Sequence, residues 1–248
     1  MIDAVITAGG RLPPDLAGRF GTDVKACVSI GGSTMLARTI EALRGVHEVA
    51  RIVVVGPEAA RGMADADEFI LERATGEENL LAALRAASGD RTVFCASDMP
   101  FVSTRALADL LERAPADACA VYPIFTRDEF EREYPKGRSS FATLADGAWT
   151  GASAFVVRAA ALLHSERIVT RAFGARKNLS ALAALFGPML TIAYLRGALR
   201  VADIEARASA LFGAPVVALR GADPALALDC DDAADFDYAE ALLARTPP

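Results

Sequence analysis

The sequence predicts an α/β fold with three layers, in which helices cover both faces of a mixed, mostly parallel β-sheet. Short apolar runs alternate with longer stretches whose apolar residues recur at helical spacing. The runs at 4–8, 52–55 and 92–96 are almost continuously apolar, which is typical of strands that are buried on both faces. This order of strands and helices favours a parallel sheet with right-handed crossovers.

The first half of the chain shows this alternation most clearly. Gly56-Pro57 ends one apolar run, and Ser103 or Thr104 is placed to cap a helix. The expected elements are, in chain order, a strand at 4–8, a helix at 34–43, a strand at 52–55, a helix at 79–87, a strand at 92–96, a helix at 104–113 and a strand at 119–122.

The alternation breaks between 123 and 157. A charged run, a loop and the turn pair Asp146-Gly147 indicate an antiparallel excursion over the sheet there. Because no internal repeat or low-complexity linker is visible, we expect residues 1–248 to form one domain. The remaining expected elements are a strand at 154–157, a mainly helical segment at 158–211, late strands at 216–219 and 225–228, and a final helix at 233–244.

The amino-acid composition argues against several classes of function. The formal net charge of −6 argues against broad nucleic-acid binding, which needs a basic face. The four cysteines are widely spaced and the two histidines lie apart from them, so zinc sites and histidine-based triads are not expected. Without a signal peptide or a long apolar run, we expect a cytoplasmic protein with no membrane contact. The oligomeric state is left open, with a homodimer as one alternative.

Unusual residues follow three of the predicted strands. Gly9-Gly10 ends the first strand, where glycines let the backbone approach a ligand and present N–H groups to phosphate oxygens. Asp98 follows a buried strand, where a carboxylate can reach Mg²⁺ held by phosphates, or can simply cap a turn. Asp229 and Asp231 fall on one face of a late strand, next to acids that can cap the final helix.

A lysine follows the glycine-rich segment. Gly9-Gly10 matches neither a dinucleotide fingerprint nor a P-loop, because the further glycines and the Gly-Lys-Ser/Thr sequence are missing. Lys25 is nevertheless well placed to neutralise phosphate charge. Taken alone, a solvated surface lysine is the simpler interpretation of this residue.

Together, these segments resemble the nucleotidyltransferases of the GT-A-like fold, and most closely the MobA-like NTP transferases. The matching segments are Ala8-Gly9-Gly10, Lys25, residues 32–43, Asp98-Met99-Pro100, Thr150-Gly151 and residues 229–236. Three departures from the family pattern are visible: a longer loop before Lys25, a missing lysine in Gly32-Ser33-Thr34, and an eroded acidic motif at 231–235.

The resemblance implies transfer of a nucleotide from an NTP to a small phosphorylated acceptor, molybdopterin-like or a sugar phosphate, with release of pyrophosphate. It implies Mg²⁺ or Mn²⁺ on Asp98 and Asp231, with Asp229 as the alternative second ligand. Lys25, helped by Arg11 or Arg19, would stabilise the charge that develops in the transition state. The implied nucleotide-binding residues are Ala8, Gly9, Gly10, Gly76 and Asn79, and the candidates for acceptor binding are Thr150, Gly151, Lys136, Arg138 and Lys177 with its neighbour Arg176.

Two other functions compete with this hypothesis. A glycosyltransferase of similar fold would use a sugar nucleotide, but it normally carries Asp-x-Asp where this chain has Ser97-Asp98-Met99-Pro100. A non-catalytic nucleotide-binding regulator is the second alternative, and the eroded acidic motif leaves room for it.

Overall fold

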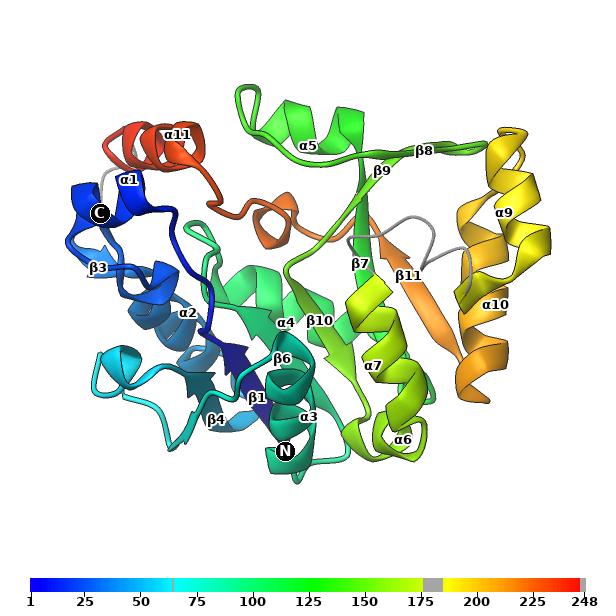
Figure 1. Ribbon diagram of the computed structural model, residues 1–248, viewed down its shortest axis with the longest axis horizontal. Helices are drawn as coiled ribbons and strands as arrows, with labels where there is room; N and C mark the ends of the chain where they lie inside the picture. The colour runs from blue at the N-terminus through cyan, green and yellow to red at the C-terminus, as the bar shows by residue number, and fades with distance from the viewer. Residues whose placement is uncertain (64, 176–184, 246–248) are drawn as a thin grey trace.

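The structure, a computed structural model, describes residues 1–63, 65–175 and 185–245 (Figure 1). In these residues, nine strands form one sheet in the order β5-β4-β1-β6-β10-β7-β9-β8, with β11 pairing with β7. The strands are β1 (Ile2–Thr7), β4 (Val49–Gly56), β5 (Glu68–Leu71), β6 (Thr92–Ala96), β7 (Ala120–Thr126), β8 (Ala142–Leu144), β9 (Gly147–Gly151), β10 (Ala154–Val157) and β11 (Val216–Arg220). Two short strands, β2 (Ser29–Ile30) and β3 (Ser33–Thr34), form a separate hairpin.

The sheet is mixed, and most of its strands point the same way. β4, β1 and β6 are parallel neighbours, and β5 and β11 extend parallel pairing to β4 and β7. Only β9 and β10 among the described strands of this sheet run against this direction, and both pair with β7. The predicted fold class is therefore confirmed.

Helices cover both faces of the sheet (Figure 1). The helices are α1 (Pro14–Phe20), α2 (Met35–Arg44), α3 (Gly76–Ala86), α4 (Thr104–Arg113), α5 (Arg127–Glu133), α6 (Ala159–His164), α7 (Glu166–Ala175), α9 (Pro188–Leu195), α10 (Val201–Phe212) and α11 (Ala233–Leu243). In this described part of the chain, no helix has the length and apolar character needed to cross a membrane.

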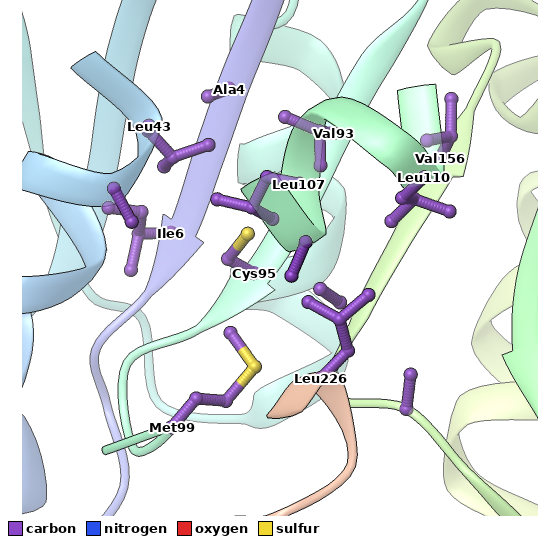
Figure 2. Close-up of a cluster of buried hydrophobic side chains, with 14 of the residues drawn as sticks. Ala4, Ile6, Leu43, Val93, Cys95, Met99, Leu107, Leu110, Val156 and Leu226 are labelled. Atoms are coloured by element: carbon purple, nitrogen blue, oxygen red, sulfur yellow. The ribbon is translucent and has the colours of Figure 1, made fainter. Parts of the chain in front are cut away.

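Side chains that alternate between the two faces of the sheet divide the core into two layers. Ala4 and Ile6 of β1 join Val93 and Cys95 of β6 in packing against α2 and α4, as Figure 2 shows. Val5, which points to the opposite face, packs instead with residues of α3, α6 and α7. Because successive strand residues point to opposite faces, an unbroken apolar strand supplies both layers at once.

Local signals explain where several elements begin. The predicted helix at 104–113 is confirmed, with the Ser103 hydroxyl accepting a hydrogen bond from Ala106 N. The helix predicted at 79–87 begins earlier, at Gly76, because Thr75 and Glu78 form a capping box. The charged run near 128–133 forms α5, which a second capping box between Thr126 and Glu129 starts.

One predicted strand is wrong. Residues 225–228 were expected to extend as a strand, but a 3-10 helix spans Pro224–Leu226. Proline has no N–H to donate to a strand ladder, and the Asp223 carboxylate accepts a hydrogen bond from Ala225 N and so favours a turn. The late strand predicted at 216–219 is present as β11.

Candidate active site

The candidate site lies at the carboxyl ends of β1 and β6. These strands are parallel neighbours, and Thr7 at the end of β1 pairs with Ala96 at the end of β6. The segments that follow, Gly9-Gly10 and Asp98, therefore leave the sheet side by side. This edge of a parallel sheet is where ligands bind in open α/β folds.

Lys25 is held against the glycine segment. Its backbone N–H donates to the Gly10 carbonyl oxygen at 3.0 Å, and its side chain packs on Gly10, where an added Cβ would lie 3.2 Å from Lys25 Cδ. The side chain is only 11% exposed. The interpretation of Lys25 as a solvated surface lysine is therefore wrong.

The Lys25 ammonium group lies between two carboxylates. Nζ is 3.4 Å from Asp98 Oδ2, and it also donates to Asp231 Oδ1. The two acids come from distant parts of the sequence, yet one ammonium group reaches both. Asp98 and Asp231 are thus close enough to contact a single cation.

A third acid borders this pair. Asp229 accepts a hydrogen bond from Ser153 Oγ at 3.2 Å, whereas Asp232 caps α11 by accepting from Ala234 N and Asp235 N. The capping role that was an alternative for the acidic cluster thus belongs to Asp232.

Burial and mutual repulsion shift the titration of these groups. Burial raises the pKa of Asp98 although the Lys25 ammonium opposes the rise, and the charge of Asp231 adds to it. Burial, followed by the charges of Asp98 and Asp231, raises the pKa of Asp229 to about 6. Burial disfavours the charged form of Lys25, but the two carboxylates outweigh burial and raise its pKa. The acids crowd one another, and additional positive charge would relieve this.

Asp98 fits the role of a metal ligand on a specific observation. Its Oδ1 is buried and has no hydrogen-bond partner, which is costly unless a ligand satisfies it. Among the described residues, no group of three or more His, Cys, Asp and Glu side chains could hold a metal ion. Mg²⁺ is usually bound by one or two carboxylates together with substrate phosphates, and the pair of Asp98 and Asp231 matches that donor set.

Arg11 and Glu72 lie against Gly9, the first residue of the glycine pair. Arg11 donates to the Gly9 carbonyl oxygen at 2.8 Å and forms an ion pair with Glu72. A Cβ on Gly9 would lie 2.7 Å from Glu72 Oε2 and 3.8 Å from Asn79 Nδ2. Asn79 Oδ1 accepts from Arg73 N at 2.6 Å, which points the amide nitrogen toward Gly9.

The structure places the other residues predicted to contact the nucleotide in different parts of the molecule. Ala8 is fully buried, and its N–H donates to Val55 O at 2.8 Å, which continues the β1–β4 ladder. Gly76 is the first residue of α3, and a Cβ there would meet the Phe173 ring at 2.9 Å. Arg19 pairs with Asp237 and Glu240 of α11, a helix that lies beside α1 in Figure 1. Of the two candidate arginines, Arg11 is the one that contacts the glycine segment.

A pocket of about 410 Å³ lies next to the acids. It is lined in part by Asp229, Asp231, Arg138, Thr150 and Gly151. Thr150 shares a 2.6 Å hydroxyl contact with Ser139, and Arg138 pairs with Asp232. The pocket thus joins the predicted acceptor-binding residues to the predicted metal ligands.

Two predicted acceptor residues are not among the described residues that line this pocket. Lys136 is exposed in the loop after α5 and is not among the described lining residues. Lys177 and its neighbour Arg176 lie outside the residues that the structure describes.

Glu72 and Tyr122 are two of the site residues that sequence analysis missed. Glu72 follows β5, a four-residue strand whose short apolar run Phe69-Ile70-Leu71 is the only sequence signal for it. Tyr122 was expected only as a strand residue, but it is 41% exposed on β7 and lines the pocket. Its ring covers Gly151, where an added Cβ would be 2.4 Å from Tyr122 Cε1.

The fold is shared with solved structures of several transferases. A hypothetical transferase from Thermus thermophilus is 29% identical, with a TM-score of 0.83 over 94% of this chain and 98% of that one. A nucleotidyl transferase from Methanothermobacter is 19% identical, with a TM-score of 0.59 over 100% and 99% of the two chains. The 2-C-methyl-D-erythritol 4-phosphate cytidylyltransferase from Thermus thermophilus is 21% identical, with a TM-score of 0.58 over 98% and 100%. The last two structures are only 19% and 21% identical to this chain, so their similarity concerns the fold alone.

No curated protein sequence matches the chain. The family model of the MobA-like NTP transferase domain matches residues 4–131, just over half of the 248 residues. The match spans the glycine segment, Lys25 and Asp98, and it favours nucleotidyl transfer over the glycosyltransferase and regulator alternatives. The chain therefore belongs to the family of MobA-like NTP transferases, which are nucleotidyltransferase enzymes.

Proposed function

We propose that this enzyme transfers the nucleoside monophosphate part of an NTP to a small phosphorylated acceptor and releases pyrophosphate, using Mg²⁺ or Mn²⁺. The observation that carries the proposal is the position of Lys25 Nζ, which contacts both Asp98 and Asp231 beside Gly10. Acids that can bind a metal and an ammonium group that can bind phosphate thus meet at one strand end.

In this proposal the NTP lies along the segment Ala8-Gly9-Gly10. Gly9 and Gly10 lack side chains that would hold the nucleotide away from the backbone, and their neighbour Arg11 offers a guanidinium group for phosphate oxygens. Asn79 presents its amide nitrogen on the same side. Asp98 and Asp231 hold the divalent cation, which would neutralise charge on the α-phosphate when bound.

The transfer requires little covalent chemistry from side chains of the protein. An oxygen of the acceptor phosphate attacks the α-phosphorus in line, and the bond from that phosphorus to the oxygen bridging to the β-phosphate breaks. Pyrophosphate leaves with the electron pair of that bond. Lys25 and Arg11 stabilise the negative charge that builds up on the phosphates, and fixed positive groups of this kind contribute most of the rate in phosphoryl chemistry.

An acceptor phosphate is ionised at neutral pH, so no general base is required. The acceptor would occupy the pocket that contains Thr150, Gly151 and Arg138, since this pocket opens beside Asp229 and Asp231. In-line transfer requires the attacking oxygen to arrive from the side opposite the leaving pyrophosphate.

A pyrophosphate-release assay tests the function. The purified enzyme would be incubated with each of the four NTPs, Mg²⁺ and a panel of phosphorylated acceptors that includes sugar phosphates. We expect release that depends on metal, NTP and acceptor together, and a nucleotide-linked acceptor in the product. Binding of Mg²⁺–NTP without turnover across the panel would contradict the proposal.

A further inference from the structure

We propose that Lys25 is an internal counter-ion, which keeps free divalent metal out of the site until the phosphates of a nucleotide take over its ammonium group. The inference deepens the proposed function and relies on it for the identity of the metal ligands. It concerns the order in which the site is filled.

The ammonium group contacts both of the carboxylates that the proposed metal ion would need. Lys25 Nζ lies 3.4 Å from Asp98 Oδ2 and donates to Asp231 Oδ1. A Mg²⁺ ion bound to the same oxygens would sit about 2.0–2.1 Å from each of them. Ammonium and cation would then be close neighbours of like charge in a partly buried place, where such repulsion is strong.

Lys25 cannot simply swing into water. Its backbone is tied to Gly10 O, its side chain packs along Gly10, and only 11% of that side chain is exposed. An ammonium group that loses both carboxylates in this setting is left buried without a partner, which is costly. Binding of free metal therefore requires the unfavourable displacement of the Lys25 ammonium group.

A triphosphate removes this obstacle. Bound along Gly9-Gly10, it would place several negatively charged oxygens next to the Lys25 side chain. The flexible lysine stem lets the ammonium group turn from the carboxylates to these oxygens while the backbone stays in place. Asp98 and Asp231 are then free for the cation that the nucleotide brings. Metal and nucleotide binding are thus coupled, and such coupling acts equally in both directions.

Binding of Mn²⁺, measured by electron paramagnetic resonance without nucleotide, tests the inference directly. We expect weak binding by the wild-type protein and binding at least tenfold tighter by Lys25→Met, which keeps the stem and removes the charge. Lys25→Arg keeps the charge and should bind as weakly as wild type. Arg85→Gln, which removes a positive charge from an ion pair near the end of α3, should also match wild type. The tighter binding should disappear in Lys25→Met combined with Asp98→Asn.

A second titration uses a non-hydrolysable α,β-methylene NTP. The analogue should tighten Mn²⁺ binding by the wild-type protein at least tenfold, and by Lys25→Met clearly less. Equal Mn²⁺ affinity of wild type and Lys25→Met without nucleotide would overturn the inference, as would Lys25→Arg binding as tightly as Lys25→Met. Circular dichroism and thermal melting check folding, and Lys25→Gln replaces the methionine variant if that variant does not fold.

The two proposals fail in distinguishable ways. The titration without nucleotide involves no transfer, so tighter Mn²⁺ binding by Lys25→Met supports the counter-ion even if no NTP and acceptor release pyrophosphate. Turnover by the wild type together with equal Mn²⁺ affinities would instead support the function and reject the counter-ion.

Discussion

The backbone N–H of Cys230 donates to the carbonyl oxygen of Asp98 at 3.1 Å. This hydrogen bond joins the segment that follows β6 to the segment that precedes α11. Cys230 is only 1% exposed, so the contact is protected from water. This buried hydrogen bond thus keeps the backbone of Asp98 close to the residue that precedes Asp231. Such preorganisation is what positional catalysis requires.

Replacement of Asp98 by Asn should abolish most of the metal-dependent activity. The amide keeps the shape of the carboxylate but not its charge, and we expect pyrophosphate release to fall by roughly 10²–10³-fold, as for other groups that stabilise transition-state charge. The melting temperature should stay close to that of wild type. Asp109→Asn, on the exposed side of α4, is the matched control. Full activity of Asp98→Asn would remove this residue from the site.

The two arginines that the sequence left as alternatives should behave differently. Arg11→Ala is expected to raise the KM for NTP and lower kcat, because Arg11 lies against Gly9. Arg19→Ala loses contacts to Asp237 and Glu240 and the stacking on the Phe20 ring, and it should keep wild-type kinetics with slightly lower stability, by about 1 kcal/mol or less for exposed ion pairs. Steady-state kinetics decide the matter. Impaired kinetics of Arg19→Ala with normal kinetics of Arg11→Ala would instead indicate that the triphosphate binds near α1.

Gly151→Ala should impair acceptor binding selectively. The added methyl group would lie 2.4 Å from Tyr122 Cε1, so the ring must move away from its place on the pocket wall. We expect the KM for the acceptor to rise at least about tenfold, because small displacements in a site are costly, while the KM for NTP changes little. The double variant Gly151→Ala/Tyr122→Ala has space for the methyl group. If it differs from Tyr122→Ala alone by as much as Gly151→Ala differs from wild type, the clash with the ring is not the cause.

A pH-dependent part of stability should come from Asp3 at the far end of β1. Burial alone would raise the pKa of Asp3, but hydrogen bonds from Ser88 and Gly89 and the charge of Arg51 outweigh burial and lower it below 3.8. A carboxyl group with a lowered pKa in the folded state stabilises the protein above its unfolded pKa, and this contribution disappears as the pH falls through the folded pKa.

Urea unfolding of the wild type and of Asp3→Asn tests this. At pH 7 the variant should be less stable by about 1–3 kcal/mol, the usual cost of disturbing buried hydrogen bonds to a charged group. The difference should shrink as the pH is lowered below 4. Asp109→Asn again serves as the control, and a difference that is the same at pH 7 and pH 3 would contradict the explanation.

Local sequence patterns predicted much of the fold. The apolar runs of β1, β4 and β6 are long enough to identify buried strands, and the Ser103 cap and the period of 104–113 give α4 with its observed bounds. The strand predicted at 225–228 failed because Pro224 and Asp223 favour a turn more strongly than apolar character favours a strand. The short β5 was overlooked because it has only four residues.

The sequence by itself determined the residue types at the strand ends: the glycines after β1, the acid after β6 and the acids before α11. It could not decide which of them meet. Only the tertiary structure placed Lys25 between Asp98 and Asp231, assigned helix capping to Asp232, and set Glu72 against Gly9. The physical reason is that spacing along the chain specifies the face and end of one element, whereas contacts between distant segments depend on how the sheet orders its strands and how the core packs.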